Sequence, residues 1–194
     1  MTSPQESPPR PATGRIIFLN GTSSSGKSSI AAELLRILEP SHYHLAVDAF
    51  HAMRSKRHIP PDLVDAEIDR TVKGFHRAVA GMAAAGNPVL VDHVLSKRWR
   101  LLDCLAVLPA QDVVLIGLRC PRAELLRREQ ARGDRPPGLV ALQFDRVHAH
   151  GVYDLECDTH TYSPAECARR IRNFLPHRPS PTAFERLRRM LLDG

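Results

Sequence analysis

The chain has 194 residues, of which 43% are apolar and 25% are charged, and its formal net charge is +6. These values are ordinary for a single soluble globular domain with a sizeable core. No apolar run approaches the ~20 residues of a membrane-spanning helix, and residues 1–14 lack the apolar core of a secretory signal. Both kinds of segment are therefore excluded, and we expect a disordered leader over residues 1–14.

The first ordered elements surround a glycine-rich loop. Residues 15–20 form an apolar run that predicts a buried strand, and residues 29–38 predict a helix. Between them the sequence GTSSSGKS fits the phosphate-loop pattern G-x-x-x-x-G-K-[ST] at every fixed position. Strand, loop and helix together predict a nucleoside triphosphate site, with ATP and Mg²⁺ as the expected cofactors. Its expected nucleotide contacts are Gly21, Thr22, Ser23, Ser24, Ser25, Gly26, Lys27, Ser28 and Ser29.

Helices and strands alternate along the rest of the chain. Residues 44–48, 88–92, 113–118 and, more weakly, 153–157 predict further strands, several of them continuously apolar as in a sheet covered on both faces. Apolar residues at helical spacing predict a helix over 62–85 that Gly86 ends, and a capping box at Ser163 opens another through about Phe174. We expect an α/β three-layer fold in which a five-stranded parallel sheet lies between helices.

The domain organisation follows from this alternation. One domain is expected over residues 15–175, and it includes a helical, arginine-rich lid at about 122–148. Residues 176–182 are rich in proline and read as a hinge, followed by a short basic amphipathic helix over 184–192.

Two aspartates are the candidates for acidic chemistry. Asp48 and Asp92 are each expected to close a strand, and ligands of open α/β sheets bind beyond the carboxyl ends of the strands. We expect Asp92, in a Walker B-like strand, to hold Mg²⁺ with Ser28, and Asp48 to accept the proton of an attacking hydroxyl. The two roles could be exchanged, and a helix cap or surface acid is the alternative for each.

Arginines cluster in residues 127–135. Arg128 and Arg132 are four residues apart and share a helix face, and Arg135 follows in a turn. We expect Arg128 to contact the nucleotide, while Arg132 and Arg135 close over the triphosphate, exclude water and neutralise transition-state charge. A solvated basic helix face is the alternative.

Histidines and cysteines suggest no catalytic or metal centre. The histidines show no zinc spacing with the cysteines, and scattered surface histidines are the favoured interpretation of His51, His58, His93, His148 and His150. The four cysteines form no C-x-x-C pair. Together with a triphosphate site, this predicts reduced structural thiols in the cytoplasm.

The chain resembles the chloramphenicol phosphotransferase-like P-loop kinases over roughly residues 15–175. The matching segments are FLNGTSSSGKSSI, AVDAF, VLVDHVL, VLIGLRCPRAELLRREQARGDR and VHAHGVYDLECDT. The resemblance implies an ATP-dependent kinase that phosphorylates a hydroxyl of a small molecule, as in antibiotic modification and resistance. It also implies that Asp48 is the catalytic base, that Lys27 and Ser28 contact phosphate and metal, and that Arg132 and Arg135 are lid arginines.

Two departures from the family pattern concern the acceptor. His93 stands where the family has a second acid, and residues 51–58 form a short basic segment in place of a longer acidic one. With Asp48 and Phe50, we expect His93, Arg54 and Arg57 to border the acceptor. Together with Lys56, these residues would form a basic wall, which favours an anionic or phosphorylated acceptor over neutral chloramphenicol. The alternative, that this segment is a solvated loop without a role in binding, is equally open.

Three classes of function stay open. The favoured class is a small-molecule O-phosphotransferase, the second is a nucleotide or sugar-acid kinase of general metabolism, and the third is a non-catalytic nucleotide-binding module. The third class needs a partner-facing surface, for which the tail helix with Leu187, Met190 and Leu191 is the candidate. We expect a hydroxylated small-molecule acceptor, no nucleic acid and no membrane partner. The sequence decides neither the preference for ATP over GTP nor whether the protein forms a homo-oligomer.

Overall fold

A five-stranded parallel sheet forms the centre of the computed structural model, which describes residues 14–55, 57–132 and 138–193. The strand order is β2-β3-β1-β4-β5. The strands are β1 (Ile16–Gly21), β2 (Tyr43–Ala46), β3 (Val89–His93), β4 (Val113–Arg119) and β5 (Leu155–Asp158). The helices are α1 (Lys27–Ile37), α2 (Val47–Ala52), α3 (Val64–Ala84), α4 (Arg98–Val107), α5 (Arg122–Arg132), α6 (Leu139–Val147), α7 (Pro164–Phe174) and α8 (Ala183–Leu191). The predicted α/β fold with five parallel strands is confirmed.

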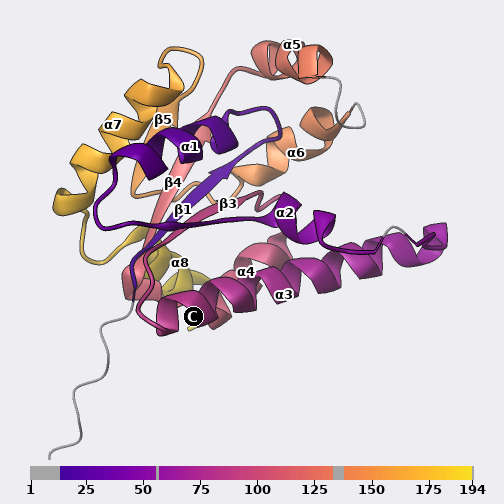
Figure 1. Ribbon diagram of the computed structural model, residues 1–194, viewed down its shortest axis with the longest axis horizontal. Coiled ribbons are helices and arrows are strands. Elements are labelled where there is room, and N and C mark those ends of the chain that lie inside the picture. Colours follow the sequence, from indigo (N-terminus) through magenta and orange to yellow (C-terminus); the bar gives the residue numbers. More distant parts are fainter. Residues whose placement is uncertain (1–13, 56, 133–137, 194) are drawn as a thin grey trace, which may run out of the picture.

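Helices cover both faces of the sheet and so make three layers (Figure 1). Because successive strand residues point to opposite faces, Ile16 and Phe18 pack in one apolar cluster with α3, α4 and α8. Ile17 and Leu19 pack in a second cluster with α1 and α7. Burial on both sides explains why the central strands are continuously apolar.

The glycine-rich loop leaves the central strand of the sheet. β1 pairs with β3 on one side and with β4 on the other, so the carboxyl ends of three strands meet around the loop. The chain crosses from one side of β1 to the other between β3 and β4, which makes this edge the topological switch point of the sheet.

Asp48 lies in a helix, which corrects the expectation that it ends a strand. β2 pairs with β3 only from Tyr43 to Ala46, where Ala46 stands opposite Asp92. The chain then turns directly into α2, whose first turn contains Asp48. The apolar residues before Asp48 predict one strand, but β2 lies at the edge of the sheet and its pairing with β3 ends at Ala46.

The C-terminal helix belongs to the core. Thr182 forms a capping box with Glu185 at the start of α8, and Phe184 and Leu187 are fully buried in the cluster with α3 and α4. Leu191 packs against the same cluster, whereas Met190 is 63% exposed. Most of the apolar face that we considered as a partner surface is therefore used within the molecule.

The lid region contains two helices at one end of the sheet. α5 and α6 contact each other and lie beyond the carboxyl end of β1 (Figure 1). Arg135 falls between them and lies outside the described residues, as do Lys56 and the expected leader up to residue 13. In the part of the chain that the structure describes, no helix is long and apolar enough to cross a membrane.

Candidate active site

The loop between β1 and α1 has a backbone that only glycine suits at two positions. A Cβ at Gly21 would lie 2.6 Å from Ser25 Oγ, too close for a side chain to fit without rearrangement. Gly26 has φ 85° and serves as the N-cap of α1. The tight turn directs backbone N–H groups and the amino end of α1 toward one space, which is the arrangement that binds phosphate.

Lys27 is turned onto the loop itself. Its Nζ donates hydrogen bonds to the carbonyl oxygens of Gly21, at 2.9 Å, and Thr22, at 2.8 Å, and the residue is only 8% exposed. Ser25 Oγ is buried and has no hydrogen-bond partner in the described chain. An ammonium group and a buried hydroxyl inside an inward-facing loop match the donors that a polyphosphate needs, so the loop fits the expected nucleotide.

Ser28 and Asp92 meet at the start of α1. Ser28 Oγ donates a hydrogen bond of 2.7 Å to Asp92 Oδ2, although the residues are 64 positions apart. Asp92 is 6% exposed and lies on β3, next to the loop strand. A hydroxyl beside a carboxylate supplies oxygen ligands of the kind that Mg²⁺ prefers when phosphates and waters complete its shell. No group of three or more His, Cys, Asp or Glu among the described residues could hold a metal by itself.

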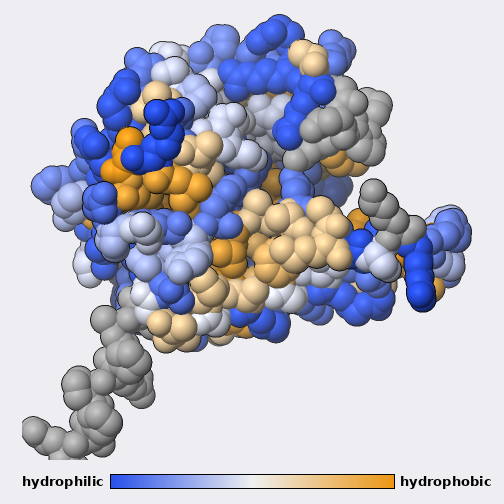
Figure 2. Space-filling model, in the orientation of Figure 1, coloured by the Kyte–Doolittle hydropathy of each residue, from blue (hydrophilic) through white to orange (hydrophobic). Residues whose placement is uncertain are grey.

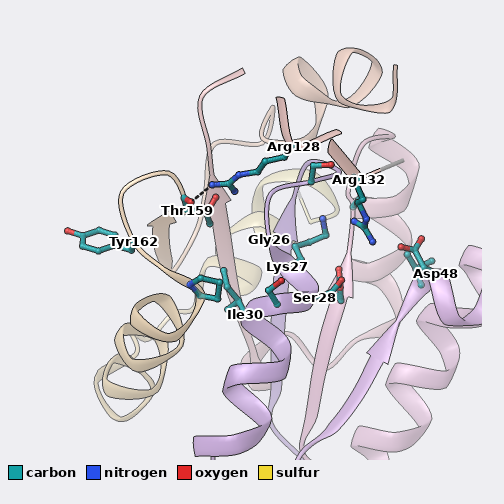
Figure 3. Close-up of a pocket in the computed structure, with 15 residues that line it drawn as sticks. Gly26, Lys27, Ser28, Ile30, Asp48, Arg128, Arg132, Thr159 and Tyr162 are labelled. Carbon is teal, nitrogen blue, oxygen red and sulfur yellow. Dashed lines mark hydrogen bonds between the residues drawn. The ribbon is translucent and has the colours of Figure 1, made fainter. Parts of the chain in front are cut away.

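One cavity of about 500 Å³ joins these groups to Asp48 and to the lid (Figure 3). In the space-filling view the surface is hollowed between α2 and the end of the molecule that carries α5 and α6 (Figure 2). The cavity is lined by Ser24, Gly26, Lys27, Ser28, Ser29, Ile30, Val47, Asp48, Asp92, Val94, Arg128, Arg132, Thr159, Tyr162 and Pro164. The predicted loop residues Gly21, Thr22, Ser23 and Ser25 lie beside it without lining it.

Of the arginines expected to contact the triphosphate, Arg128 and Arg132 line this cavity from α5. Arg128 Nε donates to Glu124 at 2.7 Å, and its Nη2 donates to the carbonyl oxygen of Thr159 at 2.8 Å. These two bonds hold its guanidinium between α5 and the loop after β5. Arg132, one turn later, extends toward the part of the cavity that Asp48 lines (Figure 3). Arg128 is thus held by partners on both sides, whereas Arg132 is an exposed side chain that lines the cavity, and its role in a lid stays a prediction.

The far end of the cavity contains residues that the sequence did not predict. Thr159 and Tyr162 come from the loop between β5 and α7 and lie opposite Asp48 (Figure 3), and Pro164, the first residue of α7, also lines the cavity. A signal was present, because the weak fifth strand and the capping box at Ser163 bracket this loop. Since ligands bind beyond the carboxyl ends of parallel strands, the loop after β5 belonged among the candidates.

Asn20 and Gln143 were also missed, and both connect the glycine loop to α6. The buried Asn20 amide donates to the Val147 carbonyl oxygen and to the Tyr153 hydroxyl, each at 2.8 Å, and its oxygen accepts from the Leu95 N–H at 2.9 Å. Gln143 Oε1 accepts from the Ser23 N–H at 2.8 Å. The loop and α6 are thus held together by side chains that no local pattern identifies.

The candidate acceptor residues are divided between the core and a second cavity. Phe50 packs edge-to-face on Phe75, with ring centroids 5.1 Å apart. Arg54 and Arg57 line a cavity of about 270 Å³ beside α2 and do not line the cavity at the glycine loop. His93 lines neither, so the structure places only Asp48 of this group directly beside the glycine loop.

His93 is fully buried, which corrects its interpretation as a surface histidine. Its Nε2 lies 3.2 Å from Nε2 of His76, whose Nδ1 lies 2.6 Å from an Asp103 carboxylate oxygen. Burial lowers the pKa of both histidines, and His93 is shifted well below its usual range. The ring points to the face of the sheet opposite Asp92, where it contacts Phe18 and Phe75.

Comparison with known proteins assigns the family. A family model described as chloramphenicol phosphotransferase-like protein matches residues 14–176, so the chain belongs to the chloramphenicol phosphotransferase-like family. A Mycobacterium tuberculosis protein provisionally named an O-phosphotransferase is 29% identical over 203 residues, which cover 93% of this chain and 90% of that protein. The family supports a phosphotransferase, as expected from the sequence.

Solved structures share the fold. A sugar kinase from Janibacter sp. HTCC2649 has a TM-score of 0.64 at 19% identity, covering 84% of this chain and 95% of the kinase. The Mycobacterium tuberculosis APS kinase CysC, solved with AMPPNP and APS, has a TM-score of 0.61 at 20% identity, covering 86% and 99%. The predicted P-loop kinase architecture is therefore confirmed.

Proposed function

We propose that this member of the chloramphenicol phosphotransferase-like family is an ATP-dependent O-phosphotransferase that phosphorylates a hydroxyl of a small molecule. The observation that carries the proposal is the single cavity lined by the start of α1, by Asp92, by Asp48 and by two arginines of α5. Phosphoryl transfer needs a phosphate cradle, a metal ligand set, an oriented nucleophile and positive charge around the moving group. The cavity contains a candidate for each.

The two ends of the cavity suggest how the substrates lie. The glycine loop and Lys27 hold the phosphates, and the loop of Thr159 and Tyr162 borders the rest of the nucleotide. Arg128, fixed by Glu124 and Thr159, contacts the nucleotide between these regions. At the opposite end Asp48 orients the acceptor hydroxyl and takes its proton as the new bond forms. Arg132 lies between the two and balances the charge on the transferred group.

Ser28 and Asp92 are the residues that would hold Mg²⁺, which neutralises phosphate charge when bound. Their hydrogen bond places both oxygens on one side of the cavity.

The four cysteines are free and buried in the structure, which agrees with reduced thiols in the cytoplasm, where we place the enzyme.

A nucleotide or sugar-acid kinase is the second candidate. The same cavity would serve it, and the two exposed arginines beside α2 favour an acceptor with negative charge. A non-catalytic nucleotide-binding module has less support, because Leu187 of the tail helix is buried in the core. Chloramphenicol modification and antibiotic resistance follow only if the acceptor is such an antibiotic.

The test is acceptor-dependent turnover. The protein is incubated with Mg·ATP and with hydroxylated antibiotics, nucleotides or sugars, and ADP and the phosphorylated product are measured by mass spectrometry. The proposal expects ADP that forms with an acceptor and disappears in folded Lys27→Ala protein. Nucleotide turnover that is unchanged in that variant, or a parent protein that binds no ATP, would contradict it.

A further inference from the structure

The second cavity lies where α2 passes into the start of α3. It measures about 270 Å³, and His51 of α2 lines it together with Arg54 and Arg57 from the following segment. The opposite wall comes from the first two turns of α3, and these two helices pack directly against each other. In Figure 1 this part of α3 extends to one side of the sheet, with α2 above it. The cavity is therefore built by elements that contribute nothing to the glycine loop.

α2 connects this cavity to the catalytic one. Asp48 lines the first cavity and His51 lines the second, three residues later on the same helix. Three residues correspond to about 4.5 Å of helix rise and bring the side chains to neighbouring positions on one face. Burial lowers the pKa of His51 and the Asp48 carboxylate pulls it upward, which agrees with a short separation. A molecule in the second cavity can thus present a hydroxyl to Asp48.

The lining of the second cavity has an excess of positive charge. Arg54 and Arg57 are exposed, and within the described part of the chain neither forms an ion pair. Glu67 is the carboxylate on the opposite wall, but Arg70 already pairs with it. The two guanidinium groups consequently give this cavity a net positive potential, and each can bind a carboxylate or phosphate through two parallel hydrogen bonds.

The rest of the lining is apolar. Ile59, Val64 and Ile68 line the cavity, and the Thr71 hydroxyl donates to the carbonyl oxygen of Glu67, so it is already occupied as a donor. Apolar walls with a few charged groups are typical of sites that bind a carbon skeleton and recognise one polar substituent. This cavity is thus suited to a small organic anion.

We infer that the acceptor is a small hydroxylated molecule that carries an anionic group, either carboxylate or phosphate, and that Arg54 and Arg57 bind that group while Asp48 orients the hydroxyl. This inference rests on the proposed phosphotransferase activity. Asp48 lies in the first turn of α2 and Arg54 lies two residues beyond the end of that helix, so the hydroxyl and the anion are bound at separate points of the acceptor.

The transfer balances without a further reactant. The acceptor oxygen forms a bond to the γ-phosphorus of ATP, the bond from that phosphorus to the β–γ bridging oxygen breaks, and ADP leaves. The hydroxyl proton passes to the Asp48 carboxylate. The anionic group of the acceptor takes no part in the chemistry and serves only to hold the acceptor in position beside Asp48.

A binding experiment tests the anion site without knowledge of the acceptor. The parent protein is saturated with Mg·AMPPNP so that the glycine loop is occupied, and acetate or inorganic phosphate is then titrated at low ionic strength. Arginine Nε–Hε signals, assigned with the single variants Arg54→Gln and Arg57→Gln, are followed by NMR together with the backbone amide signals of residues 64–71, which report binding in every variant. We expect saturable shifts of these two signals, and the anion with the lower dissociation constant identifies the carboxylate or the phosphate class.

The control matches the change in charge. The Arg54→Gln/Arg57→Gln double variant should weaken anion binding at least tenfold, whereas Arg169→Gln/Arg189→Gln, two exposed arginines far along the chain, should leave it within twofold. Shifts that do not saturate, or equal binding in both double variants, would overturn the inference while leaving the kinase proposal intact. Failure of the parent protein to bind Mg·AMPPNP contradicts the proposed function instead, and the titration without nucleotide then still tests the anion site.

Kinetics with a turned-over acceptor provide the second test. The Arg54→Gln/Arg57→Gln variant should raise the acceptor KM at least tenfold and leave the ATP KM within twofold, and the effect should shrink as salt rises. A neutral acceptor that both proteins turn over equally well would overturn the inference and return the assignment to chloramphenicol-like substrates.

Discussion

Ser28 Oγ and Asp92 Oδ2 are joined by a 2.7 Å hydrogen bond that links the first turn of α1 to the end of the neighbouring strand β3. The bond brings a hydroxyl and a nearly buried carboxylate together at the mouth of the glycine loop. In the proposed enzyme the two residues would hold Mg²⁺ together.

Substitution of either partner should weaken Mg·ATP binding. We expect Ser28→Ala and Asp92→Asn each to lower Mg·ATP affinity about tenfold or more, equivalent to ~1.4 kcal/mol. Ser28→Ala removes an oxygen ligand and leaves the Asp92 carboxylate without its donor, and Asp92→Asn removes the negative charge that faces the metal. Calorimetry with Mg·AMPPNP measures the effect, and Ser41→Ala, at an exposed position that does not line the cavity, is the comparator. Equal affinities in all three variants would show that this pair does not hold the metal.

Asp48→Asn should reduce turnover far more than nucleotide binding. Asp48 lies in α2, away from the bond between Ser28 and Asp92, so it can contact the acceptor while the metal stays in place. A base that takes the proton of the hydroxyl contributes ~10²–10⁴-fold to rate. Steady-state kinetics and AMPPNP calorimetry separate the two effects. Loss of Mg·AMPPNP affinity with turnover retained at saturation would make Asp48 a metal ligand and Asp92 the better base candidate.

Arg132→Ala should lower kcat by ~10²-fold, the scale of removing one donor to a transition-state anion. Its guanidinium lines the cavity between the loop and Asp48, whereas Arg127 on the same helix pairs with Glu124 and lines no part of that cavity. Arg127→Ala is therefore the matched control and should stay within about twofold of the parent. Similar losses in both variants would indicate a general effect of charge on α5.

Triphosphate should also slow amide hydrogen exchange in the lid. α5 carries two arginines that face the cavity, so bound nucleotide adds contacts that stabilise it. Exchange across residues 122–148 is compared with and without Mg·AMPPNP. Equal exchange in both states would show that α5 is ordered independently of the nucleotide.

The unfolding free energy should fall as pH drops from 7 to 5. Burial lowers the pKa of His93 well below 6.5 and lowers the pKa values of His148 and His150 to about 4. These folded-state values lie below the unfolded value, so below pH 6.5 the unfolded chain binds more protons and the folded state loses stability. We expect about 1–2 kcal/mol per buried histidine by pH 5. Urea titrations at pH 5, 6, 7 and 8 measure it.

A variant pair identifies the source of this slope. His93→Phe fits the aromatic surroundings of Phe18 and Phe75 and should make the pH dependence shallower. His58→Asn, at an exposed position, should leave it unchanged. A parallel pH profile for the two variants would assign the slope to other groups.

Local sequence determined the phosphate-binding loop and most of the helices and strands. The loop residues Gly21 to Ser28 act on one another through backbone conformation, so their spacing alone predicts the phosphate site. The capping box at Ser163 and the glycine that ends the long helix at residue 86 are likewise contacts between near neighbours, and both occur as predicted. Continuous apolar runs predicted strands covered on both faces because burial in a parallel sheet requires them.

Only the tertiary structure decided which distant groups meet. The pairing of β2 with β3 stops at Ala46 and so places Asp48 on a helix rather than a strand. Strand alternation sends Asp92 to the loop and the adjacent His93 into the core. Arg128 of α5 donates a hydrogen bond to the carbonyl oxygen of Thr159, which follows β5. Such contacts depend on the register and packing of elements far apart in the chain, and a local pattern contains no information on either.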